Sequence, residues 1–287
     1  MSFMKPEQIA LTAGETGWKK AYYPILSKQL PLGFAAGAYI ALGFLLAIRV
    51  SAGLPPAWSG LAGAVGAAVF PVGLILTLAA GGELLTGNMM TLSMACFQGK
   101  IPAYRVAFNW FWITIGNFAG ALFVAYVFGH LVGLTEQGEY LTRTLALAHG
   151  KLEEPFLAAF LSGVGCNWLV ALAVWLAYGS KDGTGYVFGI WFPTMAFVAI
   201  GFQHVVANMF LIPAAIFAGH ATWAEYIANF VPVFLGNAVG GALFVTGVYG
   251  IAYAKKQPSA AEKHGGTADL EWGKDSSAGI EQISGLH

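Results

Sequence analysis

The polar residues that could do chemistry lie in two similar blocks, each in the middle of a long apolar run. The first block, residues 83–89, reads Glu-Leu-Leu-Thr-Gly-Asn-Met, and the second, residues 203–209, reads Gln-His-Val-Val-Ala-Asn-Met. Polar and ionisable groups are costly in such surroundings, which makes them candidates for function. The candidates in the two blocks are Glu83, Thr86, Asn88, Gln203, His204 and Asn208.

His204 is the strongest of these candidates, because a neutral imidazole costs less in an apolar environment than a permanent charge. An unperturbed histidine titrates at about pH 6.5, so its ring can donate a hydrogen bond or a proton to an anion near neutral pH. A neutral histidine bonded between helices is the structural alternative. We favour a functional role, because His204 lies inside the repeated block.

The polar neighbours of His204 have structural interpretations as well. A carboxylate at Glu83 would be stabilised by the dipole and the free N–H groups of a following helix. We favour that interpretation over a cation or proton relay, because a fixed negative charge would repel an anion. Thr86 is placed either to cap the same helix or to bond His204. Asn88, Asn208 and Gln203 are interpreted as structural polar groups.

Two further polar residues flank the apolar runs. Lys151 precedes one run, and the sequence leaves two roles open for it, a solvated surface charge or an attractor of anions. Asn167 lies within that run. The apolar residues near the two blocks are packing residues by default, but they would also form constrictions that hydrated ions cannot pass. These residues are Phe70, Leu74, Leu84, Leu85 and Phe197.

The elements that position these residues are membrane spans. The chain is 57% hydrophobic and 10% charged, whereas soluble domains are about a quarter charged. Apolar runs long enough to cross a bilayer cover residues 30–48, 58–97, 107–134, 155–178, 187–217 and 226–254. The second run has 40 residues and one charge, which is long for one span and short for two. We therefore predict that the second and fifth spans are broken helices.

The two halves of the chain repeat each other. In both halves the asparagine of the polar block precedes a Gly-Asn pair by the same 29 residues, from Asn88 to Asn117 and from Asn208 to Asn237. Each half has three spans, so the second half must be inserted upside down. Inverted repeats are typical of transporters and channels, whose sites lie where discontinuous helices meet. The prediction is an all-α integral membrane protein of six transmembrane helices in two inverted three-helix repeats.

Charge predicts the orientation of these spans. Eleven of the 14 basic residues lie on the side that holds both termini, which places both termini in the cytoplasm. We divide the chain into an N-terminal cytoplasmic segment, a first three-span repeat, a periplasmic loop, a second three-span repeat and a disordered cytoplasmic tail. The corresponding ranges are 1–29, 30–134, 135–154, 155–254 and 255–287.

Composition and motifs argue against other classes of function. The net charge is zero, so nucleic-acid binding is not expected. The two cysteines, Cys96 and Cys166, lie in apolar runs, and no metal-binding or nucleophilic motif accompanies His204. We therefore expect no enzyme, no cofactor and no metal. An aquaporin-type channel for neutral solutes is the alternative from another class, but the chain lacks Asn-Pro-Ala motifs.

At these residues the chain resembles the formate/nitrite transporter family, over roughly residues 5–255. The resemblance is carried by the blocks at 81–88 and 201–208 and by Asn-Trp-Leu-Val at 167–170. It implies an aquaporin-like protomer with one pore, assembled as a homopentamer in a bacterial or archaeal inner membrane.

The resemblance also implies roles for single residues. By motif position, His204 is the central pore histidine, Thr86 is its hydrogen-bond partner, and Asn167 and Lys151 are a polar pair near the pore. Three leucines, at positions 74, 84 and 85, match the cytoplasmic constriction, and two phenylalanines, at 70 and 197, match the periplasmic one. Gln203 stands where some formate-transporting members have an acidic residue, which puts the pH response and the substrate in question.

The expected function is a channel or transporter for small monovalent anions, with formate as the substrate we choose. Nitrite and hydrosulfide carriers share the machinery, and acetate and lactate are further candidates. Helix N-termini and Lys151 would draw the anion in, and His204 would supply a hydrogen bond and, at low pH, a proton. A neutral acid then crosses an apolar constriction at a lower desolvation cost than an ion.

Overall fold

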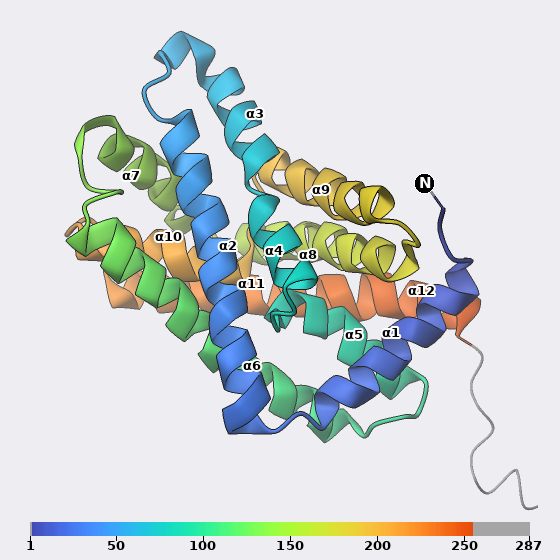
Figure 1. Cartoon of the computed structure of the whole chain (residues 1–287). Helices are drawn as coiled ribbons and strands as arrows, with labels where there is room; N and C mark the ends of the chain where they lie inside the picture. Colours follow the sequence, from blue (N-terminus) through green and yellow to red (C-terminus); the bar gives the residue numbers. More distant parts are fainter. Residues whose placement is uncertain (1, 255–287) are drawn as a thin grey trace, which may run out of the picture. The chain divides into compact units, whose positions relative to one another are not determined.

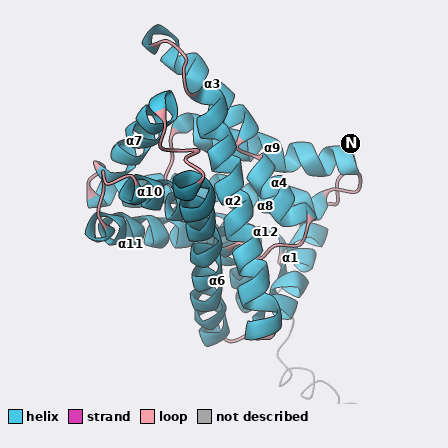
Figure 2. Cartoon of the chain, turned by 60° about the vertical axis from the view of Figure 1, so that its left-hand side comes forward, coloured by secondary structure: helices cyan, strands magenta, loops and turns pink. Residues whose placement is uncertain are grey.

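The computed structural model describes residues 2–254, and these residues are helical apart from short loops and one isolated bridge between Phe3 and Ser180 (Figure 2). Six helical segments in this range are long and apolar enough to cross a membrane. They are Ile25–Ser51, Ser59–Ala79, Ala103–Leu131, Phe156–Gly179, Gly183–Ile200 and Trp223–Tyr253. The predicted all-α fold of six spans is confirmed. The predicted disordered tail, 255–287, lies outside the described residues.

The first half begins with a helix that precedes the spans, and its second span is divided into three pieces (Figure 1). Its elements are α1 (Pro6–Ala21), η1 (Ile25–Gln29), α2 (Leu30–Ser51), η2 (Pro56–Trp58), α3 (Ser59–Val69), α4 (Val72–Ala79), α5 (Leu85–Phe97), α6 (Ala103–Phe123) and η3 (Val124–Leu131). The chain turns at Pro71 between α3 and α4, where proline cannot continue the hydrogen-bond ladder of the preceding helix.

The second half has the same order of elements, and here the fifth span is divided into two pieces. Its elements are α7 (Gly138–Leu152), α8 (Phe156–Gly179), α9 (Gly183–Ile200), α10 (Val205–Phe217), α11 (Trp223–Val239), η4 (Gly240–Gly247) and α12 (Val248–Tyr253). Pro193 is accommodated inside α9, unlike Pro71 in the first half. The prediction of broken second and fifth spans is confirmed.

Each break begins at a glycine that leaves the helical conformation. Gly81 has a φ of 88° and Gly201 a φ of 90°, a conformation that side chains with a Cβ rarely adopt. Within the membrane, backbone N–H groups freed at a break must find partners in the protein. Asn117 Oδ1 accepts from Leu85 N, and Asn237 Oδ1 accepts from Val205 N, each at 2.9 Å. The paired asparagines therefore stabilise both breaks.

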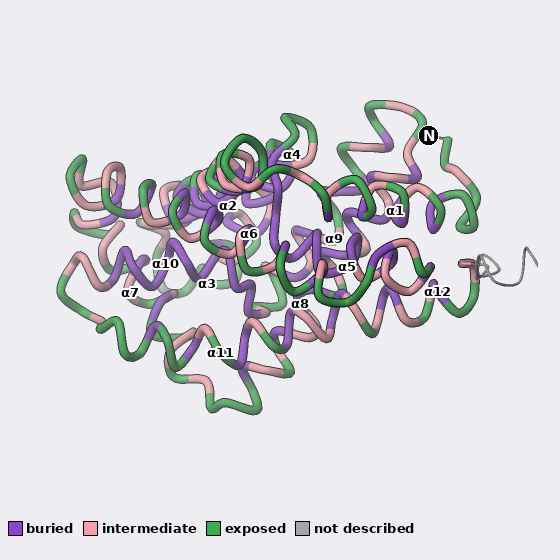
Figure 3. The backbone as a smooth tube through the Cα atoms, turned by 90° about the horizontal axis from the view of Figure 1, so that it is seen from below, coloured by how far each residue is buried: buried purple, intermediate pink, exposed green. Residues whose placement is uncertain are grey.

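The two half-helices α5 and α10 form the buried centre of the described chain (Figure 3). Around them α2 packs on α6, and α8 packs on α11, as equivalent pairs of the two repeats. Glycine allows the first pair to approach closely, because a Cβ on Gly37 would collide with the backbone of Asn117. Close packing of this kind is how transmembrane helices associate without a hydrophobic driving force.

Both segments that precede the repeats contain an additional helix. α1 occupies most of the N-terminal segment 1–29 and packs on α5, and α7 occupies most of the segment 135–154 and packs on α10. The correspondence between the halves therefore extends beyond the three spans to the helix that precedes them.

Candidate pore site

His204 lies at the start of α10, with its ring almost fully buried at 2% exposure. Its Nδ1 accepts a hydrogen bond from the backbone N–H of Ala207 at 3.0 Å, and its Nε2 lies 3.0 Å from Thr86 Oγ1. Because a backbone N–H can only donate, Nδ1 must carry a lone pair. A neutral ring then has its proton on Nε2, which donates to the hydroxyl of Thr86.

Thr86 comes from the other half of the chain, in the first turn of α5. Its hydroxyl accepts from His204, which leaves its own proton free to donate to a third group. Its backbone carbonyl accepts from Asn167 Nδ2 at 3.2 Å, and the same Nδ2 donates to the carbonyl of Asn237 at 2.7 Å. The structure thus brings three of the four predicted pore residues into one hydrogen-bonded group. The Oδ1 of Asn167 is buried and has no hydrogen-bond partner within residues 2–254.

The predicted constriction residues are all buried, with exposures of 0 to 3%. Phe197 stacks on the His204 ring with 5.6 Å between centroids and meets Phe70 edge to face at 5.7 Å. The three leucines, Leu74, Leu84 and Leu85, belong to the same apolar cluster. Leu84 is the N-cap residue of α5, the position that His204 has in α10. The His204 ring therefore packs against Phe197, which belongs to the same apolar cluster as the three leucines.

Glu83 is held by a lysine that the sequence analysis did not consider. Lys20 of α1 places its Nζ 3.1 Å from Glu83 Oε1 and 2.9 Å from Asn88 Oδ1, and Asn88 Nδ2 donates to Glu83 Oε2 at 2.9 Å. Burial by itself would lower the pKa of Lys20, but the Glu83 carboxylate raises it above the ordinary lysine value. Lys20 and Glu83 therefore form a buried ion pair in which each charge neutralises the other.

The expected stabilisation of Glu83 by free helix N–H groups is not what the structure shows. Asn117 already accepts from the N–H of Leu85, and the Glu83 carboxylate turns to Lys20 and Asn88 instead. The structural role assigned to Glu83 stays a prediction, now with a different physical basis.

An equivalent network surrounds the second break, without the carboxylate. Asn208 Nδ2 donates to Gln203 Oε1 at 2.6 Å and to Asn229 Oδ1 at 2.9 Å. Gln203 Nε2 and Asn229 Nδ2 both donate to the backbone carbonyl of Lys151 at 3.0 Å. In the first half, Asn88 likewise donates to Asn109, and Asn109 donates to the carbonyl of Lys20.

Lys151 is therefore the counterpart of Lys20, but its charge has different partners. Its Nζ donates to the carbonyls of Gly201 at 2.5 Å and Phe202 at 3.1 Å, at the break of the fifth span. Burial lowers its pKa, and nearby Glu154 partly opposes that effect. The side chain is not a freely solvated charge, and no hydrogen bond among residues 2–254 joins it to Asn167.

The networks reveal site residues that the sequence analysis missed, namely Lys20, Asn109 and Asn229. The signal for the two asparagines was present, because each follows its block asparagine, Asn88 or Asn208, by 21 residues. Nothing in the spacing indicated Lys20, because α1 precedes the first three-span repeat.

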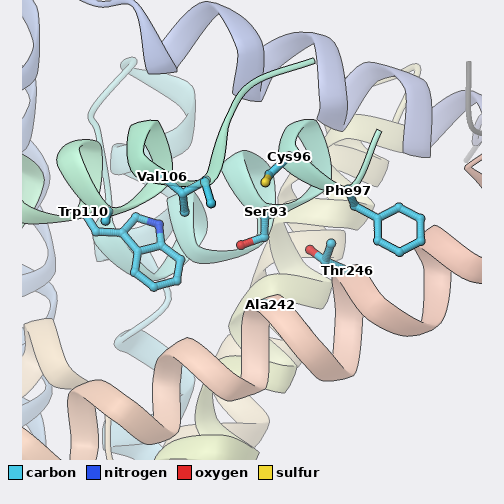
Figure 4. Close-up of a pocket in the computed structure, with 9 residues that line it drawn as sticks. Ser93, Cys96, Phe97, Val106, Trp110, Ala242 and Thr246 are labelled. Atoms are coloured by element: carbon cyan, nitrogen blue, oxygen red, sulfur yellow. The ribbon is translucent and has the colours of Figure 1, made fainter. Parts of the chain in front are cut away.

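A lateral groove of about 430 Å³ lies beside the half-helix that carries Thr86 (Figure 4). Residues of α5, α6 and η4 line it, including Cys96, Val106, Trp110 and Thr246. The Thr246 hydroxyl donates to the backbone carbonyl of Met90 at 2.9 Å and so bonds back to α5. The groove is largely apolar and is formed by other residues than those around His204.

Comparisons with known proteins point to one family. The formate/nitrite transporter family model matches residues 7–251. The chain is 59% identical over 262 residues to the uncharacterized transporter YrhG of Bacillus subtilis (strain 168), covering 91% of this chain and 98% of that one. It is 57% identical over 256 residues to the formate channel BtFdhC of Bacillus thuringiensis, covering 89% and 98%. A solved structure described as a pentameric formate channel with formate bound aligns with a TM-score of 0.68 at 29% identity, covering 84% and 99%.

Proposed function

Because the chain belongs to the formate/nitrite transporter family, a family of membrane channels and transporters rather than enzymes, we propose that its principal substrate is formate. The formate channel of Bacillus thuringiensis, 57% identical, supports this choice. Nitrite and hydrosulfide are the alternatives within the family. The single observation that supports control of passage at the centre is the hydrogen bond between Thr86 Oγ1 and His204 Nε2, which joins the two half-helices.

In this proposal the first step is electrostatic attraction. Lys151 lies at the break of the fifth span and forms no ion pair within residues 2–254, since Gln203 replaces the acidic group that Lys20 has in the first half. Its positive charge draws an anion towards the break. The deeper apolar residues exclude the hydrated ion, because desolvating a charge costs more than desolvating a neutral acid.

The second step takes place at the His204–Thr86 pair. The Nε2–H of the ring donates to the Thr86 hydroxyl, and that hydroxyl donates its own hydrogen bond to the anion. The two donors therefore form a chain that points toward the substrate. Protonation of the ring at Nδ1 would require the bond from Ala207 to break. His204 therefore acts as a neutral donor through Nε2, and a second proton on the ring, with formate then passing as formic acid, comes at the expense of the Ala207 bond.

The remaining parts of the proposal concern the assembly and the membrane. The similar solved structure described as a pentameric formate channel supports a homopentamer with one pore in each protomer. The excess of basic residues on the side of α1 supports cytoplasmic termini in the inner membrane of a bacterium or archaeon. We keep the domain boundaries predicted from the sequence as part of the proposal, with α1 inside the segment 1–29 and α7 inside the segment 135–154.

The proposal is tested by uptake of formate, nitrite and hydrosulfide into proteoliposomes between about pH 5 and 8, the range in which a histidine titrates. The variants are His204→Asn and Thr86→Val. The matched control is Thr144→Val, because Thr144 is also buried but donates to Tyr140 O of its own helix, α7.

Wild type should transport formate fastest. Thr86→Val should slow formate uptake about tenfold or more, because it loses one hydrogen bond to a charged group. Thr144→Val should leave the uptake rate unchanged. His204→Asn should alter both rate and pH profile. A His204→Asn variant that keeps both would show that His204 is a packing residue, and faster nitrite or hydrosulfide transport would overturn the choice of formate.

A further inference from the structure

Another cavity, lined by none of the predicted pore residues, lies where the first and second spans meet the membrane surface. It has a volume of about 400 Å³ and lies between the end of α2, the 52–58 connection, the start of α3 and α7. The polar and charged residues that matter in its lining are Ser51, Ser59, Glu139, Thr142 and Arg143. The volume is within the usual range for small-molecule sites.

The cavity is at the depth of lipid headgroups. Ser51 is the last residue of the first span and Ser59 is the first residue of the second. Between them Trp58 is 57% exposed, and exposed tryptophan is typical of the boundary between lipid and water. The cavity belongs to the membrane surface opposite α1.

Arg143 brings an incompletely bonded guanidinium to this cavity. Its Nε donates to Ser51 Oγ at 3.1 Å, and this is the only hydrogen bond the group makes within residues 2–254. The side chain is partly buried, and burial lowers its pKa. A guanidinium has five N–H donors in a planar fork that matches phosphate oxygens. The terminal nitrogens are thus donors without an acceptor in the described part of the chain.

Glu139 supplies the opposite charge from the same helix, one turn earlier. An acidic residue four positions before an arginine ordinarily forms an ion pair on a helix surface. In the described part of the chain the two ion pairs are Lys20–Glu83 and His130–Glu136, so Glu139 and Arg143 do not pair with each other. Two separated opposite charges in one cavity suit a ligand that carries both a cation and an anion.

We propose that this cavity binds the headgroup of a zwitterionic phospholipid, of the phosphoethanolamine type, from the adjacent membrane leaflet. Arg143 receives the phosphate, and Glu139 receives the ammonium group. The hydroxyls of Ser59 and Thr142 offer further hydrogen bonds, and Leu54 and Ala62 provide an apolar wall for the glycerol end of the lipid. This site is separate from the pore and does not depend on the transported anion.

The test is native mass spectrometry of the full-length protein with added phosphatidylethanolamine or phosphatidylglycerol. The variants are Arg143→Gln and Glu139→Gln, and Lys181→Gln, an exposed lysine at the other membrane surface, is the charge-matched control. Arg143→Gln should weaken the binding of both lipids about tenfold or more, as expected for a lost charged hydrogen bond. Glu139→Gln should weaken the binding of phosphatidylethanolamine only, and Lys181→Gln should change the binding of neither lipid.

Soluble phosphoethanolamine separates a lipid site from a site for free phosphates. It should compete weakly, since it lacks the glycerol and acyl contacts, and full displacement of the lipid at equal concentration would overturn the lipid assignment. Equal binding of both lipids to wild type and Glu139→Gln would overturn recognition of the ammonium. Because Glu139 is exposed, that variant stays informative if Arg143→Gln misfolds. A change of oligomer mass in Arg143→Gln would instead assign the cavity to contact with a second copy, against the proposal.

Discussion

Replacing Lys20 by methionine should destabilise the protein strongly, because it leaves the Glu83 carboxylate buried without its ion-pair partner. The side chains of Lys20 and Glu83 are 13% and 5% exposed, and their charged atoms are 3.1 Å apart. At that separation and an effective dielectric constant of about 20, the attraction is roughly 5 kcal/mol. Breaking one side of a buried pair costs about 3–5 kcal/mol in unfolding free energy.

The second half of the chain indicates how the loss is rescued. Gln203 stands at the position equivalent to Glu83 and accepts from Asn208 at 2.6 Å without any lysine ammonium. The double variant Lys20→Met with Glu83→Gln removes both charges and keeps the bond from Asn88. It should therefore recover most of the lost stability, since replacing a buried ion pair by uncharged groups is often close to neutral.

The assay is equilibrium unfolding in detergent, with Lys19→Met as the control. Lys19 is exposed on the same helix, and its replacement should change the unfolding free energy by less than about 0.5 kcal/mol. If Lys20→Met were as stable as Lys19→Met, the pair would contribute no net stability. If the double variant were as unstable as the single one, the loss would come from packing of the lysine stem.

Three further predictions concern packing and charge. Gly37→Ala should destabilise the fold by about 1–3 kcal/mol through overpacking, because a Cβ there collides with the Asn117 backbone. A Cβ on Gly60 would meet nothing within 4 Å, so Gly60→Ala should have little effect in the same unfolding assay. Gln203→Glu should slow formate uptake relative to efflux in oriented proteoliposomes by compensating the charge of Lys151, and unchanged rates would contradict that charge's role. Burial lowers the pKa of Lys151, so its charge is present below that pKa and lost as pH rises through it. Uptake should decline in alkaline buffer for wild type and stay level for Lys151→Met.

Much of the fold could be predicted because lipid leaves few choices to the backbone. Apolar runs of sufficient length had to be spans, and a polar block in the middle of a run had to mark a break. Asn88 and Asn208 each precede a Gly-Asn pair by the same spacing, which identified the two breaks as equivalent positions of the repeat. The bond between Thr86 and His204, one of two roles considered for Thr86, is present in the structure.

The helices outside the spans could not be predicted in the same way. α1 and α7 are amphipathic segments whose position depends on tertiary contacts, and hydropathy says only that they do not cross the membrane. The partner of Glu83 was missed for this reason, because Lys20 is distant in sequence and its helix had no assigned place. The ring orientation of His204 was also inaccessible, since it depends on the Ala207 N–H that its Nδ1 caps.

The differences between the two halves locate the chemistry more sharply than their likeness does. Asn117 and Asn237 make the same bonds in both halves, so they do not distinguish one break from the other. Two of the positions that differ form the central bond, because His204 stands where the first block has Leu84 and Thr86 stands where the second block has Val206. One half supplies only the ring and the other only the hydroxyl, so their hydrogen bond at 3.0 Å exists only when both half-helices are seated. A protein that needed symmetry alone would have kept the same residue at both positions.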